Sequence, residues 1–280
     1  FRVPEFVVGL TIVAIGTSMP ELAVSFFAAL EGSADISIGN VVGSNVFNVY
    51  AALGVCGLFA PMLFTRSNVR RDIPLCIAVS ALFLIVVATG GNINRTEGIL
   101  LLASYIAMLY FTIRADRKRL MEQSCEVDDT PTMPIWRIVV WIVGGLLGLI
   151  YGGQYCVESA SAIARSLGVS EATIAITLIA GGTSLPELAS SLVSILRGSP
   201  SLALGNILGS NIANILLILG VCSTITPLQL GDVTMVDIAI AVSAPVALLI
   251  TALIIGRNKL TRIESLALLA IYAVYVYFLI

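Results

Sequence analysis

The chain contains one polar block twice, and each copy places a glutamate inside a long apolar stretch. GTSMPELA begins at Gly16 and returns as GTSLPELA, and GNVVGSNVFN begins at Gly39 and returns as GNILGSNIAN, both at an offset of 166 residues. The two copies therefore align without a gap. A carboxylate at bilayer depth is costly and usually marks an ion or substrate pathway. The repeat predicts that Glu21 and Glu187 belong to two halves of one binding site.

The composition indicates a membrane protein. Hydrophobic residues make up 58% of the chain and charged residues 11%, and the mean hydropathy is +1.01. Soluble domains are far more polar, with about 25% charged residues. Apolar stretches recur along the whole chain, each long enough to cross roughly 30 Å of hydrocarbon. We expect an all-α polytopic membrane protein. The predicted spans are residues 4–30, 36–59, 73–89, 97–114, 136–164, 170–196, 202–225, 234–256 and 262–280.

The basic residues predict how these spans are oriented. If successive loops lie on alternate sides of the membrane, 13 of the 15 Lys and Arg residues fall on one side, and only Arg95 and Arg165 fall on the other. An excess of Lys and Arg marks the cytoplasmic side. The polar segment 114–134 is then cytoplasmic, and the C-terminus lies outside.

The helix count predicts inverted repeats. The step from the 4–30 span to its copy at 170–196 is five helices, and an odd step reverses the direction through the bilayer. Inverted repeats are common in secondary transporters, with the site near the midplane. The 136–164 helix has no counterpart in the first half, so we expect one more helix before Phe1. The full fold would be two inverted five-helix repeats with ten helices, of which this chain holds nine and lacks the first. The predicted divisions are 1–114 (first repeat half), 115–135 (cytoplasmic linker) and 136–280 (second repeat half).

The GTSMPE motif has the chemistry of a cation site. Pro20 cannot donate a helical hydrogen bond and so frees a backbone carbonyl one turn earlier. Thr17 and Glu21 are four residues apart and share a helix face, with Ser18 beside them. Backbone, hydroxyl and carboxylate oxygens are the ligands of hard cations such as Ca²⁺. The second copy repeats this set with Thr183, Ser184 and Glu187. The alternative is a structural carboxylate that is protonated or paired, but almost all basic residues lie in loops.

The GNVVGSN motif adds neutral oxygens. Asn40, Ser44 and Asn48 recur every four residues and make one polar stripe, and the glycines allow close helix packing. An amide offers a neutral oxygen for weak coordination. The ligands predicted from the two copies are Ser44, Asn48, Ser210 and Asn214. For both Asn48 and Asn214 the alternative is an interhelical hydrogen bond. Structural hydrogen bonding is at least an equal alternative for Asn40, Asn45, Asn206 and Asn211.

These motifs resemble the alpha-repeats of the sodium/calcium exchanger family, within the cation/calcium antiporter group, in its prokaryotic form. The resemblance rests on two GTSxPE and two GNxxGSN motifs with matching spacing. It implies a ten-helix fold and exchange of Ca²⁺ for Na⁺ by alternating access. It also implies that Glu21 and Glu187 are the central carboxylates. The implied flanking ligands are Thr17, Thr183, Ser18, Ser184, Ser44 and Ser210, with the backbone carbonyls of Ala14 and Ala180.

One residue departs from the family pattern. Many members carry Asp at the position of Asn214, whereas both copies here have Asn, so the site has two formal negative charges rather than three. The choice between Na⁺ and H⁺, the stoichiometry and any K⁺ requirement therefore stay open. A Ca²⁺/H⁺ or other cation/proton antiporter is the alternative function.

Other function classes fit the sequence less well. A cation channel could use the same polar stripe, but channels usually repeat around an axis along the membrane normal, unlike inverted transporters. The chain has no histidine, which excludes HExxH metal sites and Ser-His catalysis, so no enzyme is expected. We expect the lipid bilayer and inorganic cations as partners, with no nucleic acid and no cofactor besides transported Ca²⁺ and Na⁺. The short linker suits a prokaryotic inner membrane, and the oligomeric state stays open.

Overall fold

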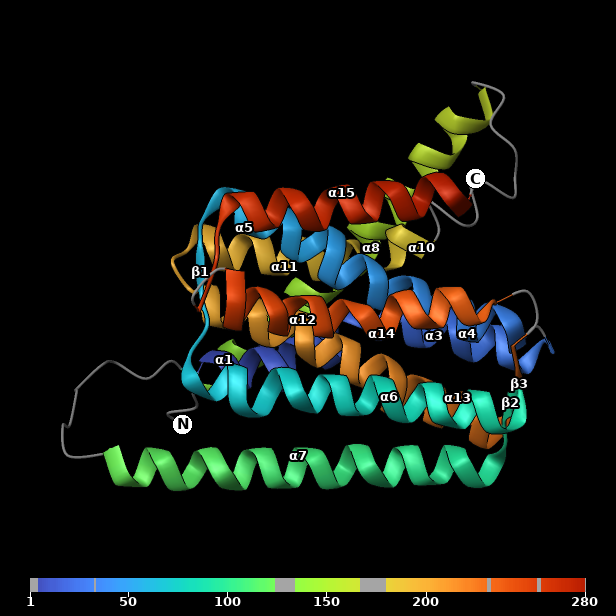
Figure 1. The fold of residues 1–280 in the computed structure, drawn as a ribbon, viewed down its shortest axis with the longest axis horizontal. Coiled ribbons are helices and arrows are strands. Elements are labelled where there is room, and N and C mark those ends of the chain that lie inside the picture. Colours follow the sequence, from blue (N-terminus) through green and yellow to red (C-terminus); the bar gives the residue numbers. More distant parts are fainter. Residues whose placement is uncertain are drawn as a thin grey trace.

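The structure is a computed structural model that describes residues 5–32, 34–123, 134–166, 180–230, 233–255 and 258–279. These residues are almost entirely helical, with four two-residue strands at the ends of the helices (Figure 1). Six described helices are long and apolar enough to cross a membrane, and a bent pair makes a seventh. The predicted all-α polytopic fold is thus confirmed. Part of the predicted 170–196 span lies outside the described residues.

The first half of the chain contributes the following elements. They are α1 (Glu5–Val8), η1 (Gly9–Val13), α2 (Ala14–Thr17), α3 (Met19–Leu30), α4 (Ala34–Val46), η2 (Phe47–Ala52), α5 (Leu53–Phe59), β1 (Met62–Leu63), η3 (Asn68–Asp72), α6 (Ile73–Gly90), β2 (Asn92–Ile93) and α7 (Arg95–Gln123). The labels η1, η2 and η3 denote short π-helical segments.

The second half repeats this order after one additional helix. Its elements are α8 (Ile135–Ser166), α10 (Ala180–Thr183), α11 (Leu185–Leu196), α12 (Pro200–Ala213), η5 (Asn214–Ile218), α13 (Leu219–Ile225), β3 (Leu228–Gln229), α14 (Met235–Ile250), η6 (Thr251–Ile255), β4 (Lys259–Leu260) and α15 (Arg262–Leu279). The repeat visible in the sequence is therefore also a repeat of elements.

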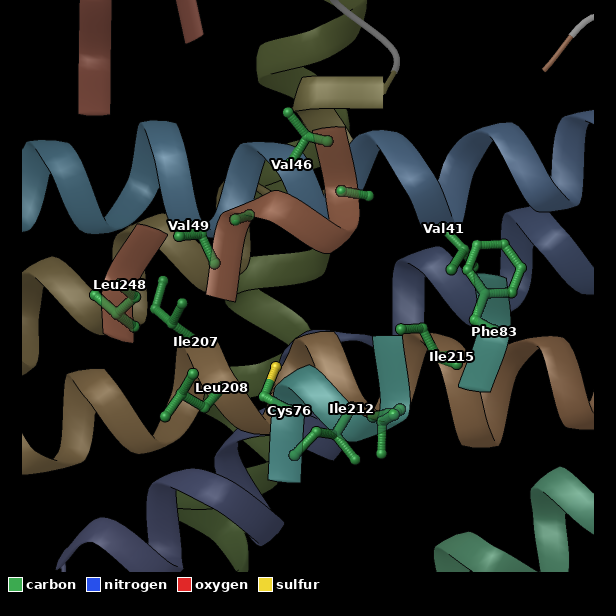
Figure 2. Close-up of a cluster of buried hydrophobic side chains, with 14 of the residues drawn as sticks. Val41, Val46, Val49, Cys76, Phe83, Ile207, Leu208, Ile212, Ile215 and Leu248 are labelled. Carbon is green, nitrogen blue, oxygen red and sulfur yellow. The ribbon is translucent and has the colours of Figure 1, made fainter. Parts of the chain in front are cut away.

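The helices that carry the GNxxGSN motifs form the centre of the molecule. The span that contains α4 is 78% buried and the span that contains α12 is 89% buried, whereas α15 is only 11% buried. Their apolar side chains make one core with α6 and α14 (Figure 2). In that view Val41 of α4, Phe83 of α6 and Ile215 of η5 gather together. Both halves of the chain thus share a single core.

Two glycines allow the backbone of η1 to lie directly against α12. A methyl group on Gly9 would overlap the carbonyl oxygen of Leu202 and would lie 2.9 Å from the backbone nitrogen of Asn206. A methyl group on Gly209 would overlap the carbonyl oxygen of Leu10 and lie close to Ala14 as well. Small residues at such crossings let membrane helices approach closely. This contact places the first GTSxPE motif against the second GNxxGSN motif.

Each end of the helix bundle carries the same small clip. β1 pairs with β4 in antiparallel register, with Met62 opposite Leu260, and β2 pairs with β3, with Asn92 opposite Gln229. β1 and β3 are separated by the repeat offset, yet Figure 1 shows them at opposite ends of the helices. Equivalent elements at opposite ends are what an inverted relation between the two halves requires.

An arginine strengthens each clip. The Arg95 guanidinium donates to the carbonyl oxygen of Ile225 at 3.1 Å, and the Arg262 guanidinium donates to that of Leu58 at 3.1 Å. These carbonyls lie at the last turns of α13 and α5, where the helix has no internal donor for them. Each clip therefore joins the last long helix of one half to the span that carries the GNxxGSN motif in the other half.

The helix α7 continues beyond its predicted end at residue 114. It runs to Gln123 and so takes in the first part of the predicted linker. This segment, RADRKRLMEQ, is rich in good helix formers. Its Lys118 and Glu122 stand one turn apart, a spacing that favours helix. The low hydropathy of this charged segment predicted a loop, but the segment instead forms a helix that extends beyond the apolar part of α7.

The close crossing of η1 and α12 gives a first prediction. Gly9→Ala and Gly209→Ala should each destabilise the protein by about 1–3 kcal/mol, because the added methyl group meets backbone atoms that cannot move independently. The matched control is Gly144→Ala on α8, where an added methyl group meets nothing within 4 Å. That variant should be neutral or slightly stabilising. Thermal unfolding in detergent measures all three, and equal melting temperatures would contradict the packing described.

Candidate cation site

Both GTSxPE motifs break their helices at the serine. In the first copy, the segments Gly9–Thr17 and Met19–Leu30 meet at Ser18 with a bend of 50°. In the second copy, α10 ends and α11 begins on either side of Ser184, whose φ of −89° and ψ of 5° are not helical. A proline occupies the first turn of the helix after each break. Each break lies two residues before a proline, a residue that cannot donate a helical hydrogen bond.

The two glutamates are fully buried and each is held by a serine from the other half. The Ser184 hydroxyl donates to Oε1 of Glu21 at 2.8 Å, and the Ser18 hydroxyl donates to Oε1 of Glu187 at 2.9 Å. Ser210 adds a longer contact of 3.4 Å to the same oxygen of Glu187. The two motifs are thus hydrogen-bonded to each other across the two halves.

The asparagines Asn40 and Asn206 support the backbone of this site. The Asn40 amide donates to the carbonyl oxygen of Glu21 at 3.2 Å, and the Asn206 amide donates to that of Glu187 at 3.3 Å. Their side-chain oxygens accept hydrogen bonds from the threonine hydroxyls of the opposite copy. These two bonds, Thr183 to Asn40 and Thr17 to Asn206, are both 3.2 Å long. Structural hydrogen bonding therefore accounts for Asn40 and Asn206.

Four more amides link α4 and η2 to α12 and η5. The Asn48 amide donates to Oδ1 of Asn211, and the Asn214 amide donates to Oδ1 of Asn45, both at 3.0 Å. The amides of Asn45 and Asn211 in turn donate to each other's backbone carbonyl oxygens at 3.4 and 3.2 Å. The predicted interhelical hydrogen bonds of Asn48 and Asn214 thus exist, but each uses only the nitrogen of its amide.

Several buried oxygen atoms in this region have no hydrogen-bond partner among the residues that the structure describes. They are Oε2 of Glu21, Oε2 of Glu187, Oδ1 of Asn48, Oδ1 of Asn214 and the hydroxyl of Ser44. Buried polar atoms in proteins are nearly always paired. α3 packs against η5, which begins at Asn214, and α11 packs against η2, which contains Asn48. These unpaired oxygens are of the carboxylate, amide and hydroxyl types that bind Ca²⁺ and other hard cations.

The two remaining predicted ligands are the backbone carbonyls of Ala14 and Ala180, at the starts of α2 and α10. Ala14 is fully buried, and its carbonyl oxygen accepts the Ser18 backbone N–H at 3.0 Å. The Thr17 hydroxyl also donates to this carbonyl oxygen, at 3.4 Å. Ala180 is the first residue of α10. The structure describes its backbone but not the environment of its side chain. Within the described residues, no group of three or more His, Cys, Asp or Glu side chains could hold a metal ion. Glu21 and Glu187 are the carboxylates that the described residues bring together here.

Comparison with known proteins agrees with this arrangement. Residues 1–114 and 137–280 match the family described as sodium/calcium exchanger protein. CaxA of Alkalimonas amylolytica is 38% identical over 99% of this chain and 89% of its own length. The sodium/calcium exchanger MaX1 of Methanosarcina acetivorans is 30% identical over 98% of this chain and 88% of its own length. A solved structure of the sodium-calcium exchanger NCX_Mj has a TM-score of 0.83 and 30% identity, and the match covers 100% of this chain and 89% of that one.

The fold and the comparisons define a multi-pass membrane transporter. The chain belongs to the sodium/calcium exchanger family, and the resemblance seen in the motifs is confirmed. Members of this family are exchangers rather than catalysts, and the match supports antiport of cations and Ca²⁺.

The backbone-supporting asparagines give a second prediction. Asn206→Ala should destabilise the protein by about 2 kcal/mol, because Thr17 loses its acceptor and the buried Glu187 carbonyl loses its donor. Asn40→Ala should act in the same way. The control is Asn92→Ala on the exposed strand β2. Unfolding in detergent without added Ca²⁺ measures the effect, and melting temperatures equal to that of the control would contradict a structural role.

Proposed function

We propose that this protein exchanges Ca²⁺ for Na⁺ by alternating access at a site formed by Glu21 and Glu187. The observation that carries the proposal is the set of unpaired oxygens beside two cross-bonded carboxylates, all in the buried centre of the molecule. Water cannot solvate these charges there, so a bound cation is the natural partner. Two carboxylates match the charge of one Ca²⁺.

Competition for the same carboxylates couples the two ion movements. If Ca²⁺ occupies the pair, Na⁺ cannot bind there, and the reverse also holds. An empty pair would carry two buried negative charges through the switch between sides, which is costly. The loaded site switches more readily than the empty one, so the outward movement of one ion drives the inward movement of the other.

The inverted relation between the halves supplies a route to both sides. The contacts between the two halves at the glutamates have counterparts at the repeat offset: Ser18 with Glu187 corresponds to Ser184 with Glu21. Two halves with the same contacts can exchange conformations, which opens the site first to one side and then to the other. We propose that the switch takes place around a site of fixed composition.

We infer the orientation from the charged end of the bundle. Arg66, Arg70, Lys259 and Arg262 are exposed and lie near the β1–β4 clip. By the positive-inside rule this end faces the cytoplasm. The linker would then be cytoplasmic and the C-terminus outside, in a prokaryotic inner membrane.

The carboxylates give a third prediction. Glu21→Gln and Glu187→Gln should each abolish Na⁺-gradient-driven Ca²⁺ uptake into liposomes, because each removes half of the negative charge that binds Ca²⁺. Glu31→Gln is the control, because Glu31 is exposed at the end of α3. Size-exclusion chromatography confirms that the variants fold. Undiminished uptake by either site variant would refute the assignment.

The coupling ion gives a fourth prediction. The protein in liposomes should take up radioactive Ca²⁺ when an outward Na⁺ gradient is imposed, and an H⁺ or K⁺ gradient alone should not drive uptake. Uptake driven by H⁺ alone would identify a Ca²⁺/H⁺ antiporter instead. Ca²⁺ flux that needs no ion on the opposite side would indicate a channel.

A further inference from the structure

The amide network of Asn45, Asn48, Asn211 and Asn214 has a direction set by the backbone. The side-chain nitrogen of Asn45 donates to the carbonyl oxygen of Asn211, and the side-chain nitrogen of Asn211 donates to that of Asn45. A backbone carbonyl only accepts hydrogen bonds. The nitrogen end of both amides must therefore face the backbone, and their oxygen ends face away from it.

The orientation of Asn45 and Asn211 also fixes the orientation of the amides of Asn214 and Asn48. Because Oδ1 of Asn45 and Oδ1 of Asn211 are acceptors, the groups that meet them must be donors. Those groups are the side-chain nitrogens of Asn214 and Asn48, each at 3.0 Å. The oxygen and nitrogen of an amide are distinguished by such a network, and here every link agrees. What remains is Oδ1 of Asn48 and Oδ1 of Asn214, both fully buried and unpaired.

We propose that Asn45 and Asn211 are positioning residues that hold the amides of Asn214 and Asn48 with their oxygen toward the transported cation. The inference rests on the proposed cation site. If either amide turned over, its NH₂ group would face the cation and repel it. The side-chain oxygens of Asn45 and Asn211 prevent this, because a turned amide would point its own oxygen at one of these acceptors. The backbone carbonyls in turn hold Asn45 and Asn211 in place.

The positioning acts across the two halves of the chain. Asn45 is three residues from Asn48, but its oxygen holds Asn214, and Asn211 likewise holds Asn48. The network also requires an amide at position 214. A carboxylate there would have no proton to donate to Oδ1 of Asn45. Two neutral amide oxygens are thus built into the site, and its negative charge comes from Glu21 and Glu187.

A double-mutant cycle tests this crosswise coupling. Asn45→Ala removes the acceptor for Asn214 but keeps the Asn45 backbone carbonyl, so the arm from Asn211 to Asn48 stays in place. Ca²⁺ affinity is measured on the full chain by calorimetry, and Na⁺ affinity by competition. Asn45→Ala should weaken Ca²⁺ binding by about tenfold, the loss expected from one oriented ligand worth about 1.4 kcal/mol.

The cycle has a matched control within the same network. Adding Asn45→Ala to Asn214→Ala should change the affinity by less than about twofold, because the ligand that Asn45 orients is already gone. Adding Asn45→Ala to Asn48→Ala should still weaken binding by about tenfold, since Asn48 is held by the other arm. A role confined to general stability would give the same loss in both backgrounds.

The outcomes separate the two proposals. Additive losses at positions 45 and 214, or coupling of position 45 to 48 instead, would overturn the positioning role while the cation site stands. A wild-type protein that binds no Ca²⁺ would refute the site and this inference together. If Asn45→Ala does not fold, the cycle of Asn211→Ala with Asn48→Ala tests the same claim on the other arm, with Asn214→Ala as its control.

Discussion

The burial of two carboxylates in an apolar helix bundle is the constraint on which the rest of this structure depends. Glu21 and Glu187 are both fully buried, and charged groups removed from water need specific partners. Each receives one hydroxyl from the opposite half of the chain and keeps a second oxygen unpaired. The first oxygen ties the two halves together, and the second is the oxygen that the proposed cation would contact. In the proposed site, stability and ion binding therefore draw on the same two side chains.

Two kinds of contact hold the halves together: direct contacts in the centre of the molecule, and a pair of equivalent clips at its ends. The amide network and the backbone contact at Gly209 join α4 and η1 to α12 directly, and neither leaves room for sliding. The clips at both ends attach the peripheral helices α7 and α15 to the opposite halves. Figure 1 shows these two helices along opposite edges of the molecule. In the proposed exchange cycle, these contacts would keep the ligands in register while the kinked segments change access.

The asparagine at position 214 matches the hydrogen-bonding needs of its neighbours. Family members often carry a carboxylate there, yet in this chain the neighbouring Asn45 presents an oxygen that needs a donor. An amide satisfies that oxygen and still offers its own oxygen to the site. The negative charge of the site is then limited to the two glutamates, and the counter-ions have to be balanced against that charge.

The helical membrane class, the repeated motifs and the helix break near Pro20 follow from the sequence alone, because hydropathy, repetition and proline chemistry are local properties. The sequence also predicted that both glutamates belong to one site. It also offered interhelical hydrogen bonds for Asn48 and Asn214 as an alternative to cation binding. It did not predict that one amide could bond through its nitrogen and still present its oxygen to a cation. It took the packing of the helices to show that each serine holds the glutamate of the other half. The same packing shows that Asn40 and Asn206 support the backbone, while Asn45 and Asn211 accept hydrogen bonds from other amides. All of these asparagines lie on the same two motifs, and the periodicity of a helix does not distinguish them. Their roles differ because a hydrogen bond depends on which donor or acceptor faces it, and that is set by helix packing across 166 residues of chain.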